Sequence, residues 1–278
     1  MSRDDNVAVF ENTAKLCKEN QKLKENIDRA IKGQKLILEN DSIENIEKNI
    51  YEEPAKLIVS KKRSFEAAEG YKDFKVCVHN FASASNPGGG VTNGANAQEE
   101  CLCRCSTLYP CLSTREMFYG FYAPHRKEKN PLHNDDMIYT PNITVFKTDT
   151  SAPKLMDEKD WYDVSVITCA APNLRTYPSN AYNTGDGDKA VKITDKDLLA
   201  LHEKRLRRIL DVAVMEGNEV VILGAFGCGA FSNNPRVVAQ AAKNVIKEYR
   251  QAFKVIEFAV YCSGRDEENY KVFAGMIK

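Results

Sequence analysis

The sequence lacks long hydrophobic runs and any excess of charge of one sign. No apolar stretch approaches the roughly 20 residues that a membrane helix requires. The opening MSRDDNVAVF has neither the apolar core nor the small-residue cleavage site of a signal peptide. The 278 residues contain 39 Lys and Arg against 39 Asp and Glu, so no net field would attract a polyanion, and direct nucleic-acid binding is not indicated. We expect a soluble intracellular protein, located in the cytoplasm or, in a eukaryote, the nucleus, with no membrane partner.

The sequence also lacks the ligand spacing of a metal site. Four of its nine cysteines cluster as Cys101, Cys103, Cys105 and Cys111. A zinc site pairs ligands two to four residues apart with a second pair at a distance, whereas alternate residues of a helix point to different sides and cannot converge on one ion. The four histidines are scattered and form no His-x-x-x-His pair. We therefore predict no metal and no cofactor, with reduced cysteines as small buried hydrophobic residues; a zinc site is the weaker alternative.

The first 52 residues differ in composition from the rest. Residues 6–51 are rich in Lys, Glu, Asn and Leu, and apolar residues recur at helical spacing, which predicts helix as far as Tyr51. Pro54 marks the exit from this segment. We predict an N-terminal helical accessory region over residues 1–52 and a main domain over residues 53–278. We expect the helices to pack on the main domain as an amphipathic flank; a partner-binding coiled coil is the alternative.

The main domain combines buried strands with amphipathic helices. Apolar segments with little polar alternation are typical of strands buried on both faces; these segments are residues 55–60, 75–82, 163–171, 219–226 and 255–261, with a further strand or two expected within 137–147. Residues 195–217 and 234–249 have helical patterns, and the second begins with Asn234 as N-cap and Pro235 at the first position. Strands that alternate with helices predict an α/β sandwich.

Two glycine-rich turns follow predicted strands, at the end where open α/β sheets bind ligands. The first is NPGGG, residues 86–90, and the second is GAFGCGAFSNNP, residues 224–235, which precedes a helix. Inward-facing backbone amides and a helix N-terminus suit a phosphate group. The spacing matches neither G-x-G-x-x-G nor G-x-x-x-x-G-K-[ST], which argues against a Rossmann dehydrogenase or a P-loop NTPase. A tight structural turn is the alternative for the second loop.

Two adjacent carboxylates follow the first glycine loop. Gly90 is separated by seven residues from Gln98, which introduces Glu99 and Glu100. If residues 94–109 form a helix, both acids lie in its first turn, where the helix dipole favours them and a cleft can reach them. They are either ordinary first-turn acids or part of a site that joins an acid pair to a glycine-lined anion cleft. The second interpretation suits cleavage of the glycosidic bond of a phosphate-bearing sugar.

The stretch NFASASNPGGGVTNGANAQEECLCRCSTLY resembles the signature of microbial-type poly(ADP-ribose) glycohydrolases, in which three glycines precede Gln-Glu-Glu by six to eight residues. Later blocks of the same family resemble YTPNITVF, TCAAPN and LGAFGCGAFSNNP, in the expected order. The similarity spans roughly residues 55–265. It implies a macrodomain-like three-layer α/β/α sandwich with a mixed sheet, extended by the N-terminal helices, and a catalytic domain over residues 53–278.

The resemblance also implies roles for the site residues. Glu100 would be the catalytic acid that protonates the departing 2′-oxygen and then the base that activates water, while Glu99 would hold the reacting ribose. A general acid at neutral pH requires a raised pKa, which an adjacent anion and a closed cleft can supply. The glycine run would lie against the diphosphate and ribose, the second loop would offer amides to the diphosphate, and Phe231 would stack on the adenine with Asn233 or Asn234 nearby. The substrate-binding set implied in this way is Asn86, Gly88, Gly89, Gly90, Gln98, Gly227, Cys228, Gly229, Ala230, Phe231 and Asn233.

Three interpretations of this pattern stay open. The first is hydrolysis of poly(ADP-ribose), mainly from chain ends, with ADP-ribose or poly(ADP-ribose) on modified proteins as the partner. The second applies the same cleft to another linkage, in ADP-ribosyl protein, O-acetyl-ADP-ribose or an ADP-ribosylated nucleobase. The third is a reader that binds ADP-ribose without turnover. An intact Gln-Glu-Glu argues against the reader, because a pure binder does not need the acid; the first two share every residue named here.

Overall fold

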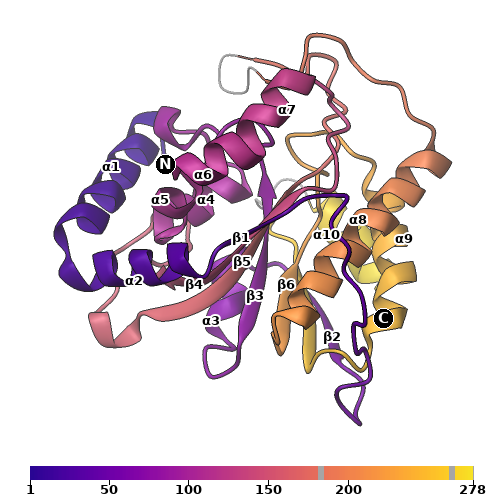
Figure 1. The fold of residues 1–278 in the computed structure, drawn as a ribbon, viewed down its shortest axis with the longest axis horizontal. Coiled ribbons are helices and arrows are strands. Elements are labelled where there is room, and N and C mark those ends of the chain that lie inside the picture. The colour runs from indigo at the N-terminus through magenta and orange to yellow at the C-terminus, as the bar shows by residue number, and fades with distance from the viewer. Residues whose placement is uncertain (181–184, 263–266, 278) are drawn as a thin grey trace.

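The computed structural model describes residues 1–180, 185–262 and 267–277 and has a seven-stranded mixed sheet at its centre (Figure 1). The strands lie in the order β1-β4-β5-β3-β6-β7-β2. Their bounds are β1 Lys35–Ile37, β2 Lys56–Ser60, β3 Val76–Ala82, β4 Met137–Val145, β5 Tyr162–Ala170, β6 Val220–Leu223 and β7 Val255–Ala259. Each strand segment expected from the sequence is confirmed, and the short β1 is an addition.

The middle of the sheet is parallel and one edge is antiparallel. β2, β7, β6, β3 and β5 run parallel to one another, whereas β4 is antiparallel to both β5 and β1. The side chains of β3 alternate between two apolar cores: Val76 and Val78 belong to one and Cys77 to the other. Because both faces are covered, the strand needs apolar residues at successive positions, as its sequence shows.

Helices cover both faces of the sheet. Their bounds are α1 Arg3–Glu19, α2 Gln21–Lys32, α3 Ser64–Glu69, α4 Gln98–Cys105, α5 Leu108–Leu112, α6 Arg115–Met117, α7 Ala123–Glu128, α8 Asp195–Met215, α9 Pro235–Ile246 and α10 Glu268–Met276, with 3₁₀ turns at Val91–Asn93, Glu158–Asp160 and Lys247–Tyr249 and a π-helical turn at Phe118–Tyr122. Helices α8, α9 and α10 share one core, and α1 to α5 share the core on the other face (Figure 1). The three layers confirm the predicted α/β fold.

The N-terminal region is helical only as far as Lys32, so the expected helix through Tyr51 is wrong in its second half. Gly33 caps α2, and a Cβ at this position would lie 2.7 Å from the ring of Pro141. The chain turns there and pairs β1 with β4, and residues 38–55 form neither helix nor strand. Helices α1 and α2 pack on the main domain, as expected, since Phe10 and Leu23 are buried in the same core as α4. The chain before and after residue 52 therefore shares one sheet and one core.

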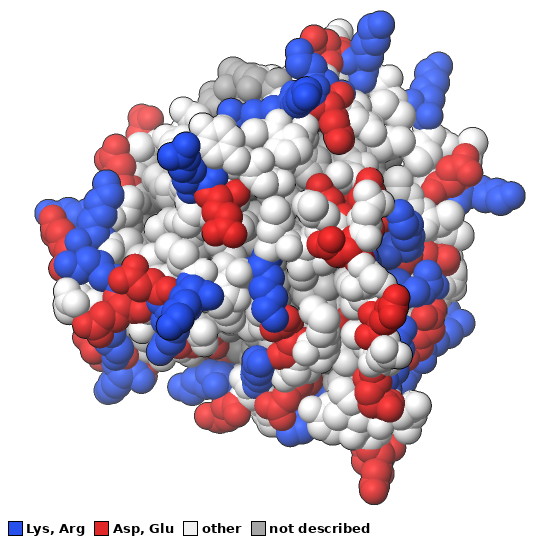
Figure 2. Space-filling model, viewed as in Figure 1, with Lys and Arg blue, Asp and Glu red and all other residues white. Residues whose placement is uncertain are grey.

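Acidic and basic side chains are interspersed over the face of the molecule shown in Figure 2, in keeping with the balanced composition. Neither sign of charge forms a continuous patch on this face. Among the described residues, no helix combines the length and the apolar character that crossing a membrane requires.

Candidate active site

A cavity of about 790 Å³ opens where β3, β6 and β7 end, the edge of the sheet that the sequence predicts to bind ligand. The N-terminus also reaches it through Met1, Arg3 and Asn6. The expected site residues that line it are Gly89, Gly90, Gln98, Glu99, Glu100, Gly227, Gly229, Ala230 and Phe231. Four other expected residues belong to the two loops but do not line the cavity: Asn86, Gly88, Cys228 and Asn233.

Two glycines of the run after β3, Gly88 and Gly89, leave no room for side chains. Gly88 and Gly89 have φ angles of 67° and 59°, which glycine adopts without strain. A Cβ on Gly89 would lie 2.5 Å from Glu100 Oε1 and 3.1 Å from Glu99 Oε2. A Cβ on Gly88 would lie 2.7 Å from the ring of Tyr109. The absence of a side chain at Gly89 therefore lets the two carboxylates pack directly against the backbone of the loop. This packing requires glycine whether or not a ligand also contacts the loop.

Glu99 is held by donors from β3 and from the glycine loop. Its Oε2 accepts the backbone N–H of Ser83 at 2.8 Å, its Oε1 accepts the side-chain amide of Asn80 at 3.3 Å, and the N–H of Gly88 also donates to this carboxylate. Glu99 is only 3% exposed. Burial, and after it the charge of Glu100, raise the pKa of Glu99 well above its ordinary value. Glu99 thus keeps its proton at a higher pH than an exposed carboxyl would.

Glu100 is fixed by a backbone amide on each oxygen. Its Oε1 accepts the N–H of Gly90 and its Oε2 accepts the N–H of Ala97, both at 2.9 Å. Ala97 is the N-cap residue of α4, so the second bond satisfies one of the N–H groups that a helix start leaves without a partner. The glycine loop and the start of α4 together set the position of this carboxylate.

The helix that carries the acids is shorter than the expected 94–109. It begins at Gln98 and ends at Cys105, and α5 follows after a break. Ser106 is extended there, and backbone bonds join this segment to the end of β4, from the N–H of Thr107 to Thr144 and from the N–H of Phe146 to Cys105. Pairing with β4 therefore replaces the helical bonds at the break. Both acids still lie in the first turn, as predicted.

Gln98 uses its amide within the protein. Its Nε2 donates to the carbonyl of His79 at 2.8 Å and to Ser64 Oγ at 3.0 Å, and its Oε1 accepts the N–H of Phe81 at 2.9 Å. These bonds fasten the first turn of α4 to β3. Gln98 lines the cavity, but its polar atoms support the wall and already have protein partners.

Asn86 supports the glycine loop from outside the cavity. Its Oδ1 accepts Nη2 of Arg126 at 2.7 Å, and Nε of the same guanidinium donates to the carbonyl of Ser85 at 2.5 Å. The structure therefore places Asn86 at a contact between this loop and α7, and its role at the substrate stays a prediction.

The loop after β6 is shaped by one buried side chain. Asn233 donates its Nδ2 to the carbonyls of Pro172 at 2.6 Å and Gly227 at 3.1 Å, and its Oδ1 accepts Nε2 of His202 at 2.9 Å. Gly227 has a φ of 76°, and a Cβ there would lie 2.6 Å from Asn233 Nδ2. Asn234 caps α9 with its side chain. Both asparagines that were expected near the adenine are thus engaged in holding the loop and the helix.

The cavity residues that the sequence analysis missed include Arg63, Asp149, Arg175 and Tyr261. The guanidinium of Arg63 lies 3.9 Å from the ring centre of Tyr261, and that of Arg175 lies 5.5 Å from the ring centre of Phe231. Asp149 accepts the N–H of Phe65 at 3.0 Å, and burial raises its pKa to about 6. Arg63 and Tyr261 follow the ends of β2 and β7, which pair in parallel, and this was the one signal that could have brought them together.

Among residues 1–180, 185–262 and 267–277, no group of three or more His, Cys, Asp or Glu side chains is arranged to hold a metal ion. The clustered thiols of Cys101, Cys103, Cys105 and Cys111 are buried around α4 and α5, and burial raises the pKa of each. Cys103, Cys105 and Cys111 belong to the apolar core, which is the role that the sequence predicts for them. Cys101 instead lines the cavity, and its Sγ accepts Nη1 of Arg63 at 3.1 Å.

The cleft combines two glycine-rich loops with a pair of buried carboxyls at its wall, and this combination on a macrodomain-like fold defines a hydrolase of the glycosidase class that acts on ADP-ribose. The chain belongs to the family of microbial-type poly(ADP-ribose) glycohydrolase (PARG) catalytic domains, whose model matches residues 4–148, just over half of the sequence. The enzyme is accordingly a PARG, as the sequence resemblance predicts. No curated protein sequence matches the chain.

Solved structures of bacterial PARGs are similar to the chain along nearly its whole length. The enzyme from Thermomonospora curvata is 26% identical, with a TM-score of 0.85 and 98% of each chain covered. The same enzyme bound to the inhibitor ADP-HPD gives a TM-score of 0.83 at 26% identity and covers 98% of this chain and 99% of its own. The Deinococcus radiodurans enzyme in complex with ADP-ribose is 28% identical, with a TM-score of 0.76, and covers 90% of this chain and 96% of its own.

Proposed function

We propose that the chain hydrolyses the ribose–ribose O-glycosidic bonds of poly(ADP-ribose), mainly from the chain ends, and releases ADP-ribose. One observation carries this proposal: two adjacent carboxylates are fixed by backbone amides at the wall of a cavity of about 790 Å³. That volume is within the range of pockets that enclose small ligands. A binding module needs the glycine loops but has no use for a buried acid pair in which one pKa is raised.

Glu100 would protonate the leaving oxygen. It is the more exposed of the two acids, at 7% against 3% for Glu99. As the bond between the anomeric carbon and the 2′-oxygen breaks, the proton of Glu100 passes to that oxygen and the anomeric carbon acquires oxocarbenium character. The resulting carboxylate then takes a proton from the incoming water, which completes the hydrolysis and restores the acid.

Glu99 would hold the reacting ribose through hydrogen bonds to its hydroxyls. The usual rule that relates the separation of two carboxyls to the stereochemical outcome does not transfer here, because it describes carboxyls on opposite sides of the bond. Glu99 and Glu100 are neighbours on one helix turn and approach the sugar from the same wall.

The diphosphate would lie along residues 227–230, where loop amides and the N-terminus of α9 favour an anion. Arg175 adds a positive charge at the same wall. Phe231 would stack on the adenine, and Tyr261 is the competing ring, although Arg63 already covers its face at 3.9 Å. Truncation of the ring that stacks should weaken ADP-ribose binding by about 1–3 kcal/mol, so calorimetry on Phe231→Ala and Tyr261→Ala distinguishes the two positions.

The preference for chain ends rests on α1. Arg3 lines the cavity, and Asn6 donates its Nδ2 to the carbonyl of Gly94 at 3.1 Å, in the loop that leads to the acids. A helix at this position would obstruct a polymer that continues in both directions. Because removal of residues 1–52 would also remove β1 and the buried Leu23, the sharper test is Arg3→Ala with Asn6→Ala. An increase in released oligomers would support the hypothesis, and an unchanged product distribution would count against it.

The decisive experiment compares the wild type with Glu100→Gln on automodified poly(ADP-ribosyl)ated protein, with products resolved by mass. Free ADP-ribose from the wild type, a ~10²–10⁴-fold loss of turnover in the variant and ADP-ribose affinity within about tenfold would establish the activity and its acid. Glu116→Gln, the same change at an exposed site, is the control. Intact polymer with tight ADP-ribose binding would direct the search to other ADP-ribose linkages or to a reader, and equal loss of binding and turnover would make Glu100 structural.

Two further points stay proposals. One is the division into a helical accessory region over residues 1–52 and a catalytic domain over residues 53–278. The other is a location inside the cell, in the cytoplasm, which the buried thiols of Cys101, Cys103 and Cys105 support because reduced cysteines persist there.

A further inference from the structure

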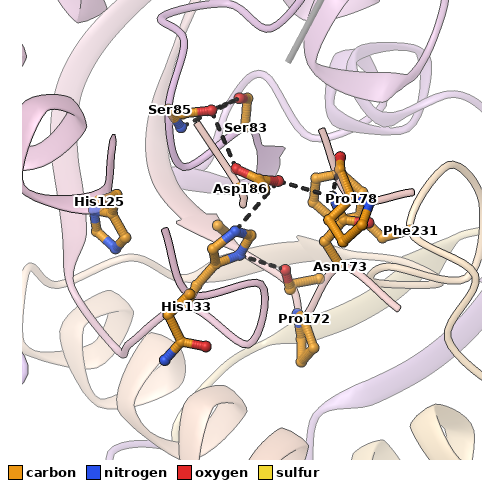
Figure 3. Close-up of polar contacts among 12 residues, drawn as sticks. Ser83, Ser85, His125, His133, Pro172, Asn173, Pro178, Asp186 and Phe231 are labelled. Carbon is orange, nitrogen blue, oxygen red and sulfur yellow. Dashed lines mark hydrogen bonds and ion pairs between the residues drawn. The ribbon is translucent and has the colours of Figure 1, made fainter. Parts of the chain in front are cut away.

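A buried carboxylate behind the glycine loop joins segments that are far apart in the sequence (Figure 3). Asp186 is 1% exposed, and it is not among the described residues that line the cavity. Its Oδ1 accepts Oγ of Ser85 at 3.2 Å, and its Oδ2 accepts Nδ2 of Asn173 at 2.8 Å. The same Oδ2 lies 3.4 Å from Nε2 of His133. One side chain thus meets the loop after β3, the turn after β5 and the segment that leads into β4.

The two glycines that flank Asp186 let the segment enter this position. A Cβ on Gly185 would collide with the side chain of Ser85. Gly187 has a φ of 79°, and a Cβ there would lie 2.5 Å from the carbonyl of Lys129. Side chains at either position would push the carboxylate away from its partners. The Gly-Asp-Gly sequence, which the proposed chemistry does not use, therefore has a structural purpose.

The imidazole of His133 faces Asp186 with its second nitrogen. Nδ1 lies 2.8 Å from the carbonyl of Ala171, which can only accept, so Nδ1 carries a hydrogen. Nε2 then either faces the carboxylate with a lone pair or, with a second proton, forms an ion pair with it. The order Ser85, Asp186, His133 places the carboxylate in the middle, so this group is not a nucleophile relay, in which the histidine would lie between the other two.

The hydrogen bond from Ser85 connects Asp186 to the loop that holds the two acids. Ser85 belongs to the loop whose N–H groups at Ser83 and Gly90 hold Glu99 and Glu100 at 2.8 and 2.9 Å. A displacement of Ser85 would move these donors and the carboxylates that depend on them.

The hydrogen bond from Asn173 connects Asp186 to the opposite wall of the cleft. Oδ1 of Asn173 accepts Nε of Arg175 at 3.1 Å, and the guanidinium of Arg175 lies over the ring of Phe231 at 5.5 Å. The N–H of Leu174 donates to the carbonyl of Phe231 at 2.9 Å. Asp186 therefore has one oxygen on the wall that carries the acids and the other on the wall that carries Arg175 and Phe231.

We infer that Asp186 is a positioning residue that fixes the glycine loop of the acids relative to the wall formed by Arg175 and Phe231. The inference rests on the proposed function of that cleft and names a residue that acts on it without touching substrate. It acts through Ser85 and Asn173, so its loss should impair turnover more than binding: a misplacement of about 1 Å at the reacting groups costs on the order of 10²-fold in rate.

The test compares Asp186→Ala, Asp186→Asn and the control Asn218→Ala. Asp186→Ala should lower kcat for ADP-ribose release by about 10²-fold and ADP-ribose affinity by about three- to tenfold. Asp186→Asn keeps the volume and an acceptor for Ser85, but its Nδ2 replaces the oxygen that accepts from Asn173, so it should regain about tenfold of the lost kcat and not all of it. Asn218 is also buried and donates to the carbonyl of Ala213 at 2.9 Å. It lies just before the start of β6, whereas the cavity lies beyond the end of that strand. Its variant should lower Tm and leave kcat unchanged.

A double variant provides a second test of the contact between Asp186 and Ser85. If Asp186 acts through Ser85, adding Ser85→Ala to Asp186→Ala should cost little beyond the single change, because both break the same contact. A kcat for Asp186→Ala within about threefold of the wild type, or a loss that Asn218→Ala reproduces at the same Tm, would overturn the inference. A wild type that releases no ADP-ribose would instead refute the proposed function, and the inference would then be decided by whether Asp186→Ala, and not Asn218→Ala, weakens ADP-ribose binding.

Discussion

Gly89→Ala is the substitution that most directly tests how the glycine run and the acids depend on each other. The added Cβ would lie 2.5 Å from Glu100 Oε1, whereas ordinary contacts begin at 3.4 Å. The three atoms nearest to this Cβ all belong to the side chains of Glu99 and Glu100, so the carboxylate of Glu100 is the group that has to retreat. Its Oε1 would then lose the bond to the N–H of Gly90, now 2.9 Å long.

Two effects of different size follow from this geometry. Alanine at a φ of 59° is strained by about 1–2 kcal/mol, which lowers stability. Relief of the clash requires the carboxylate to move by about 0.9 Å, and a misplacement of that order costs roughly 10²-fold in turnover. Loss of activity should therefore far exceed what the loss of stability explains, and ADP-ribose binding should change less than kcat.

The assay is ADP-ribose release from poly(ADP-ribosyl)ated protein, with Tm measured on the same preparations. Gly217→Ala provides a matched control, because Gly217 also has a positive φ, of 68°, while a Cβ there would meet nothing closer than Lys75 Nζ at 3.8 Å. Both variants carry the backbone strain, and only Gly89→Ala carries the clash with the acid. A folded Gly89→Ala protein whose kcat is within about threefold of that of Gly217→Ala would refute the reasoning.

Three other substitutions test separate parts of the structure. Asp149→Asn should remove the loss of stability that the buried carboxylate causes at neutral pH. Burial raises the pKa of Asp149 from 3.8 to about 6, so the folded wild type binds the carboxyl proton more tightly than the unfolded chain does. The wild type therefore loses stability as the pH rises from about 3.8 to about 6. Urea denaturation should find the variant more stable than the wild type by up to about 3 kcal/mol at pH 7.5 and no gain at pH 4. Asn233→Ala leaves the carbonyls of Pro172 and Gly227 without this donor and should cost about 2 kcal/mol of stability, with weaker ADP-ribose binding by calorimetry. Gly33→Ala places a Cβ 2.7 Å from Pro141 and should cost about 1–3 kcal/mol with kcat unchanged, measured by denaturation and turnover.

The sheet and the position of the cleft could be predicted because their signals are local. Strands buried on both faces require runs of apolar residues, and residues 75–82 and 163–171 show them plainly. Loops that follow parallel strands meet at one edge, so the two glycine loops were expected to come together, and β3 and β6 do pair in parallel. Glu99 and Glu100 were placed in a first helix turn because the dipole and the spacing favour it.

The remaining features depend on contacts between segments distant in sequence. β1 has only three residues, and its Leu36 also fits a helical pattern, so pairing with β4 decides its conformation. The break at Ser106 is likewise set by backbone bonds to the end of β4. Arg63 and Tyr261 are brought together by the register of β2 and β7, which no local pattern records.

The donors to the two acids connect the proposed site to residues that lie outside it. Main-chain N–H groups of Ser83, Gly88, Gly90 and Ala97 donate to the carboxylates, and Asn80 contributes a side-chain amide. The position of the acids is therefore set by the course of the backbone from residue 83 to residue 97. That course is held by three tethers from separate parts of the chain, from Asn6 to Gly94 and from Arg126 and Asp186 to Ser85. Because the acids follow the main chain, a change at a tether reaches them even though the tether lies outside the cavity, whereas exposed side chains of the same loop have no such connection.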